Sequence, residues 1–142
     1  MNNKDICREV AERAFNQADL SAIDEYVAVD GIDHQERPGT PIIPHLKHVI
    51  TSLHTAFPDI HFAIHDMLGE EDLVAFCMMM TGTHLGPLAL GPGPQVPPTG
   101  CKVEINHLYV LRFTNGKNVD LWHEWNVPKM LQQLGIMPGP NH

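Results

Sequence analysis

Three histidines and one asparagine are the side chains best suited to proton transfer or oxyanion binding in this chain. His34, His84 and His107 stand in three separate segments, and imidazole can exchange a proton at neutral pH. Each could be catalytic or structural. Asn126 can donate and accept hydrogen bonds but cannot take up a proton. It could orient a substrate, or it could cap the helix expected after Val127.

The strand that precedes Asn126 has two faces of different chemistry. Trp122, Glu124 and Asn126 alternate onto one face, and Leu121, His123 and Trp125 onto the other. Both faces carry a tryptophan, so periodicity alone does not show which one faces the core. Glu124 could be a base in an apolar pocket or an ordinary surface carboxylate.

Helices are expected to come first. Apolar residues recur at helical spacing from Ile6 to Ala18, and a short second helix should end near Tyr26. A third helix should run from near Pro44 to Phe57, where Pro58 stops it. Between the second and third helices, residues 31–40 are expected to form a loop.

After Pro58 the hydrophobic period changes from 3.6 to 2, which predicts strands over residues 60–65, 73–84, 102–113 and 117–126. Asn115-Gly116 is a strong hairpin signal. Residues 86–100 form a loop rich in proline and glycine, which we expect at a pocket rim. A last helix should span 128–134, with Gly135 after it. Helices followed by antiparallel strands indicate an α+β fold.

Composition narrows the function classes. The chain has 142 residues, 43% of them hydrophobic, which predicts one globular domain. Nine basic and seventeen acidic residues give a net charge of −8, which argues against a nucleic-acid partner. No apolar run is long enough to span a membrane, and the N-terminal residues do not resemble a signal peptide. Three dispersed cysteines favour a reduced, cytoplasmic protein.

A metal site is not predicted. His61 and His65 share a strand face and His45 and His48 lie one helical turn apart, but no HExxH run or CxxC pair accompanies them. We therefore expect no metal.

Several short motifs, in one order, resemble the SnoaL-like polyketide cyclase family, within the nuclear transport factor 2-like fold. They are Phe57-Pro58-Asp59, Gly82-Thr83-His84, Pro98-Thr99-Gly100, Arg112-Phe113, Asn115-Gly116-Lys117, Trp122 with a polar residue four places on, and Gln133-Leu134-Gly135. His34 matches the family's early histidine. The resemblance covers about residues 5–135 of a single domain over 1–142.

The resemblance implies a cone-shaped curved antiparallel sheet, with N-terminal helices enclosing an apolar pocket, in a homodimer or larger homo-oligomer. It also implies a cofactor-independent enzyme that acts on a hydrophobic carbonyl compound by aldol cyclisation, isomerisation or hydration. Cyclases of the family typically carry an acid/base aspartate where this chain has Asn126. The alternative is therefore a small-molecule binding protein without catalysis, or a small scaffold protein.

The candidate residues follow from both lines of reasoning. His34 and His84 are the leading acid/base candidates, with His107 behind them and Asn126 as a polar anchor. The resemblance places Trp122 and Glu124 toward the pocket. The expected substrate-binding residues are Phe57, Met79, Leu90, Trp122 and Glu124.

Overall fold

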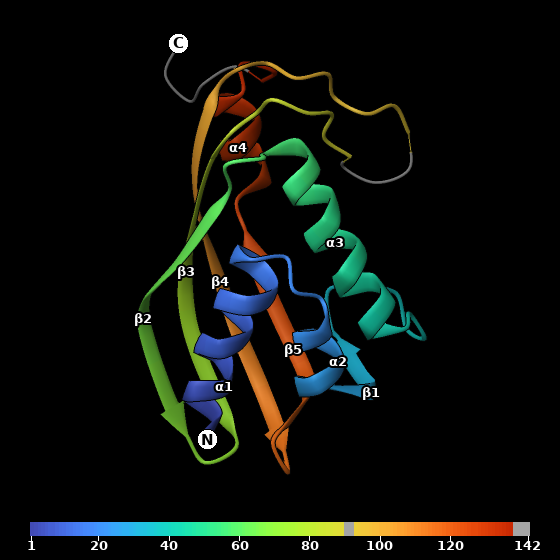
Figure 1. Ribbon diagram of the computed structural model, residues 1–142, viewed down its shortest axis with the longest axis vertical. Coiled ribbons are helices and arrows are strands. Elements are labelled where there is room, and N and C mark those ends of the chain that lie inside the picture. Colours follow the sequence, from blue (N-terminus) through green and yellow to red (C-terminus); the bar gives the residue numbers. More distant parts are fainter. Residues whose placement is uncertain (90–92, 138–142) are drawn as a thin grey trace.

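The computed structural model describes residues 1–89 and 93–137, and its α+β architecture confirms the expected fold class (Figure 1). In chain order the elements are α1 (Asn3–Val10), a π-helical stretch η1 (Ala11–Asn16), α2 (Ser21–Tyr26), β1 (Val27–Asp33), α3 (Ile42–Ala56), β2 (His61–Glu70), β3 (Leu73–Thr83), β4 (Lys102–Thr114), β5 (Lys117–Trp125) and α4 (Val127–Gln133). Helices mostly precede the strands, as predicted.

Strands β2 to β5 form the expected antiparallel meander. The hairpin between β4 and β5 turns at Asn115 and Gly116, whose φ values are 51° and 76°. Two successive positive φ values match the right-handed twist of the flanking strands. The hairpin prediction is confirmed.

One strand was not predicted. The segment expected to be a loop from residue 31 begins inside β1, which pairs parallel with β5 and completes the order β1-β5-β4-β3-β2. Its sequence, Val-Ala-Val-Asp-Gly-Ile-Asp, shows no sustained alternation of apolar and polar residues. It is a strand because the free edge of β5 offers backbone partners, which a local pattern does not reveal.

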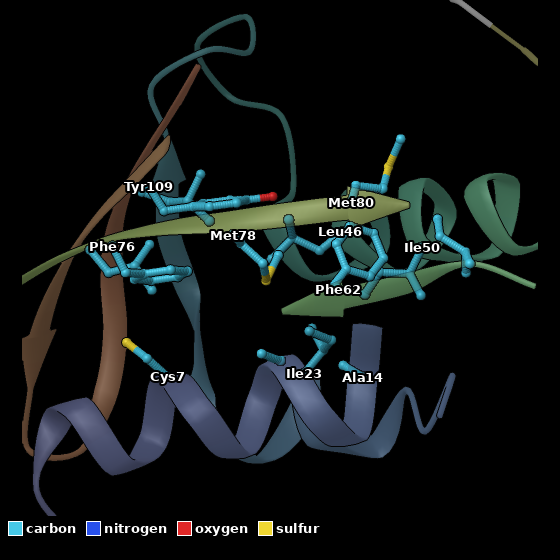
Figure 2. Packing of buried hydrophobic residues seen from close by; sticks show 14 of the residues in the cluster. Cys7, Ala14, Ile23, Leu46, Ile50, Phe62, Phe76, Met78, Met80 and Tyr109 are labelled. Atoms are coloured by element: carbon cyan, nitrogen blue, oxygen red, sulfur yellow. The ribbon is translucent and has the colours of Figure 1, made fainter. Parts of the chain in front are cut away.

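The helices and the sheet enclose the hydrophobic core. Residues of β3 and β4 are buried alternately, with Phe76, Met78 and Met80 from β3 among the buried residues (Figure 2). They pack against Cys7 of α1 and Ile50 of α3 within one cluster. We call this helix-covered side of the sheet the inner face and the opposite side the outer face.

Gly82 near the end of β3 allows close packing of the third helix. A Cβ atom at this position would lie 3.0 Å from the Cβ atom of Phe57, which follows α3 and is fully buried. The glycine therefore serves close packing, because the β3–β4 register runs through it without a shift. In the part of the chain that the structure describes, no helix is long and apolar enough to cross a membrane.

Candidate active site

Two histidines and two aromatic residues gather on the inner face where β4 and β5 pair. His107 lies opposite Trp125, and Tyr109 lies opposite His123. The His123 ring stacks on Tyr109 with centroids 4.2 Å apart, and the His107 ring stacks on Trp125 at 4.8 Å. We call these four residues the histidine–aromatic cluster. Of the four, only His107 was predicted as a site residue.

The two imidazoles of the cluster are directly hydrogen bonded. Nδ1 of His107 lies 2.8 Å from Nε2 of His123. His107 is only 2% exposed, and its Nε2 atom has no hydrogen-bond partner among the described residues. A buried N–H group without an acceptor is rarer than a buried acceptor without a donor. We therefore assign the proton to Nδ1 of His107, which leaves His123 as the acceptor at Nε2 and the donor at Nδ1.

Burial keeps both rings neutral. Desolvation, and secondarily the neighbouring His123, lowers the pKa of His107 to about 3. Desolvation lowers the pKa of His123 to about 4, because a low-dielectric environment disfavours the imidazolium form. At neutral pH the pair is a fixed set of neutral donors and acceptors.

The space between the covering helices and the sheet beside the cluster is small and apolar. A cavity of about 40 Å³ lies between α1, α2 and the inner face, with Tyr109 and Asn118 on its wall among mostly apolar residues. Such a volume holds only a few water molecules. A ligand of polyketide size would need side chains of the inner face or the covering helices to move apart.

His34 lies on the outer face, on the opposite side of the sheet from the cluster. Its ring stacks on Trp122 with centroids 4.4 Å apart, and its Nε2 atom lies 2.9 Å from an Asp120 carboxylate oxygen. Arg112 donates to the other oxygen of Asp120 at 3.3 Å. The hydrogen bond with His34, and then that with Arg112, lowers the pKa of Asp120. We call these four residues the outer cluster.

His84 is fully buried at the end of β3. The Thr99 backbone N–H donates to its Nδ1 atom at 3.2 Å, and the Thr99 hydroxyl lies 3.0 Å from the same atom. Burial lowers its pKa. These contacts bind His84 to the end of the loop before β4, and its Nε2 atom has no partner among the residues described.

Asn126 caps the last helix. Its side-chain oxygen accepts a hydrogen bond from the Lys129 backbone N–H at 2.9 Å, at the N-terminus of α4. The capping interpretation of this residue is therefore confirmed. Asn126 is exposed and directly follows Trp125 of the histidine–aromatic cluster in the chain.

The expected pocket residues are dispersed. Phe57 lies in the core, 5.5 Å from His84 between ring centroids. Trp122 pairs with Val110, Glu124 with Leu108, and Met79 with Asn106, all on the outer face. The side of the sheet expected for Trp122 and Glu124 is thus reversed, because the alternate residues Leu121, His123 and Trp125 face the helices. Leu90 lies outside the described residues.

An aspartate that was not predicted also lies on the inner face. Asp33 pairs with Leu121 in the parallel register, and its side chain is only 8% exposed. Its Oδ2 atom lies 3.7 Å from Nε2 of His45 on α3. The sequence signal for Asp33 was hidden because the segment was expected to be a loop. His123 was overlooked because the other face of β5 was favoured.

Over residues 1–89 and 93–137, no three histidine, cysteine or acidic side chains are grouped closely enough to hold a metal ion. The histidine–aromatic cluster and Asp33 place imidazole, phenol and carboxylate groups on the inner face.

Comparison with known proteins gives a consistent result. The family model of SnoaL-like polyketide cyclases matches residues 5–134. The proposed polyketide cyclase IdmH from Streptomyces antibioticus is 30% identical, with 95% of this chain and 99% of IdmH covered and a TM-score of 0.78. AclR from Streptomyces galilaeus, a proposed hydroxylase, is 29% identical over 96% of this chain and 83% of its own, with a TM-score of 0.79.

A more distant structure supports the fold alone. TsrD from Streptomyces laurentii is 18% identical, with 94% of this chain and 95% of TsrD covered and a TM-score of 0.81. No protein with a curated description matches the chain. The family match over nearly the whole chain is sufficient: this protein belongs to the SnoaL-like polyketide cyclase family.

Proposed function

We propose that this protein is a cofactor-independent, cyclase-type enzyme that acts on a hydrophobic carbonyl compound. The observation that carries the proposal is the hydrogen-bonded pair of neutral imidazoles, His107 and His123, on the inner face. Family membership, with relatives described as a proposed cyclase and a proposed hydroxylase, supports the reaction class.

The pair is suited to act on oxygen. With its Nε2 atom held by His107, His123 presents an Nδ1–H donor, and Tyr109 on one side fixes the plane of its ring. In an aldol cyclisation, negative charge develops on the enolate oxygen and then on the new alkoxide. A preorganised donor in a site with little water stabilises that charge more than water does.

Removal of the donor tests this function. In His123→Phe the ring stack on Tyr109 can persist while the N–H donor is lost, and we expect turnover to fall about 100-fold. The assay is ring closure of aromatic compounds that carry a β-keto ester side chain beside a ring carbonyl, followed by absorbance. The exposed His61 provides the control His61→Gln. Turnover that persists in His123→Phe would contradict the proposal.

His34 and His84 stay predicted acid/base candidates, although both lie away from the cluster. A His34→Ala/His84→Ala double variant tests them together. Unimpaired ring closure by this variant would leave His107 as the only catalytic histidine of the original three.

A binding protein without catalysis is the second candidate function. It is favoured by Asn126, whose side chain is engaged as a helix cap where cyclases of the family typically have an acid. Asn126→Asp distinguishes the two: a gain in ring closure indicates a weakened cyclase site. Tight ligand binding with no turnover in either form indicates a binding protein.

We also propose a homodimer or larger homo-oligomer that forms through the outer face. Cys77, Met79, Leu108 and Val110 lie there side by side on β3 and β4, and Leu108 is 48% exposed. A second copy would bury these side chains against their equivalents. Leu108→Glu should shift the sedimentation of the protein toward the monomer, and an unchanged profile would contradict this interface. The three cysteines are unpaired, which supports a cytoplasmic location.

A further inference from the structure

A nearly buried carboxylate stands on the inner face without a strong partner. Asp33 lies next to Leu121 in the parallel β1–β5 register, so the two side chains share a face. Its neighbour His34 points to the outer face, where it stacks on Trp122. Asp33, the last residue of β1, and His34, which follows it, thus point to opposite faces of the sheet, and it is Asp33 that faces the helices.

The contacts of Asp33 hold one oxygen and leave the other available. Oδ1 accepts a hydrogen bond from the Gln35 backbone N–H at 3.0 Å. Oδ2 has His45 Nε2 at 3.7 Å, which is beyond hydrogen-bond distance, and accepts no hydrogen bond among the residues that the structure describes. Burial of a carboxylate with incomplete hydrogen bonding costs free energy. The fold retains Asp33 at the inner face despite that cost.

Asp33 also lies near the histidine–aromatic cluster. Gln35, two residues further on, accepts a hydrogen bond from the His123 backbone N–H at 3.4 Å. Burial, and secondarily the charge of Asp33, raises the pKa of Tyr109. The carboxylate and the neutral imidazole pair therefore belong to one region of the inner face.

We propose that Asp33 is the general base of this site, removing a proton from the carbon beside a carbonyl group of the hydrophobic substrate. This assignment rests on the proposed function. It supplies the carboxylate that Asn126 lacks, from β1 instead of the end of β5. A positioned base of this kind accelerates proton transfer about 10²- to 10⁴-fold.

The steps balance within the protein and substrate. The C–H bond breaks, its proton passes to Oδ2 of Asp33, and its electron pair forms the enolate, whose oxygen accepts a hydrogen bond from His123 Nδ1–H. The enolate carbon then bonds to a second carbonyl carbon of the same molecule. The resulting alkoxide takes the proton back from Asp33, so the enzyme returns to its starting state and no co-reactant is consumed.

Proton exchange isolates this step from ring closure. The probe is 2-acetylnaphthalene in D2O, with deuterium uptake at its methyl group followed by proton NMR and binding followed by tryptophan fluorescence. We expect wild-type protein to accelerate exchange and Asp33→Asn to lose about 100-fold of that acceleration, with ketone binding retained. Glu36 lies at the same 3.7 Å from His45, so Glu36→Gln is the matched control and should exchange like wild type.

The outcomes separate the two proposals. Exchange that survives in Asp33→Asn, or wild-type protein that binds the ketone without exchange, overturns the role of Asp33 alone. Wild-type protein that neither binds nor exchanges the ketone overturns the proposed function as well. If Asp33→Asn does not fold, as judged by circular dichroism, Asp33→Ser replaces it, because its hydroxyl can still accept from the Gln35 N–H.

Discussion

At the scale of single residues, His107 is placed at a cost to stability. Its ring is buried with an unpaired Nε2 atom, and a buried polar atom without a partner is destabilising. Phe62 and Trp125 lie against the same ring. We predict that His107→Phe leaves the free energy of unfolding at pH 7 equal to or above that of wild type while turnover falls.

Urea unfolding at pH 7 measures the first quantity, and the ring-closure assay measures the second. A clear loss of stability in His107→Phe would show that the imidazole is needed for packing. Retained turnover would show that it is not part of the site.

The sequence predicted which residues of β5 share a face, but not which of the two faces lies toward the helices. Alternation along β5 correctly separated Trp122 and Glu124 from His123 and Trp125, because side chains in a strand have a period of 2. Which set faces the helices depends on tertiary packing, and both sets carry a tryptophan. The partner of His107 was therefore missed, although His107 itself was named.

At the scale of elements, the packing of α3 on β3 depends on Gly82. An added Cβ atom would meet the Cβ atom of Phe57, a backbone-anchored atom of a fully buried residue, at 3.0 Å. We predict that Gly82→Ala destabilises the protein by about 1 to 3 kcal/mol through overpacking, measured by urea unfolding.

Gly69 in β2 is the matched control. Its added Cβ atom would contact only the Lys4 side chain, at 3.2 Å and beyond, and a flexible side chain can move away. Equal loss of stability in Gly82→Ala and Gly69→Ala would indicate a general effect of glycine in strands instead of the contact with Phe57.

The last helix depends on its cap. Asn126→Ala removes the acceptor for the Lys129 N–H, and we predict a loss of about 1 kcal/mol in the free energy of unfolding. Asn126→Asp keeps an acceptor at the same place and should retain wild-type stability. A thermal melt that does not distinguish Ala from Asp at this position would contradict the capping role.

Most elements could be predicted because their signals are local. The proline that stops α3 after Phe57 and the glycine at the β4–β5 turn act within a few residues. Strand β1 could not be predicted in the same way, since only its pairing with β5, far away in sequence, makes it a strand. Strand β1 ends at Asp33, so the failure to predict this strand hid one residue of the candidate site.

At the scale of the whole molecule, two buried histidines, His84 and His107, and the half-buried His123 make stability depend on pH. The pKa of His107 is lowered to about 3 and that of His123 to about 4, and burial also lowers that of His84. In the unfolded chain a histidine titrates near 6.5. The unfolded state therefore binds more protons below this pH, and folding loses stability as the pH falls from about 6.5 toward about 4.

We predict that the free energy of unfolding is lower at pH 5 than at pH 7, by up to about 2 kcal/mol for each of His107 and His123. Carboxylates with a lowered pKa, such as Asp59 and Asp120, change the free energy of unfolding only at lower pH, where they take up protons. The hydrogen bond that His65 donates to the side-chain oxygen of Asn106, and then the one that it donates to Asp66, raise the pKa of His65. This raised pKa opposes the trend, but the His65 side chain is exposed. Urea unfolding should show the full loss of stability between pH 7 and pH 5 in wild type and a smaller loss in a His107→Phe/His123→Phe variant. His61→Gln is the control and should behave like wild type.

Equal stability of the wild-type protein at the two pH values would mean that the imidazoles of His107 and His123 reach water when protonated. The inner face would then be open enough to admit a ligand without rearrangement.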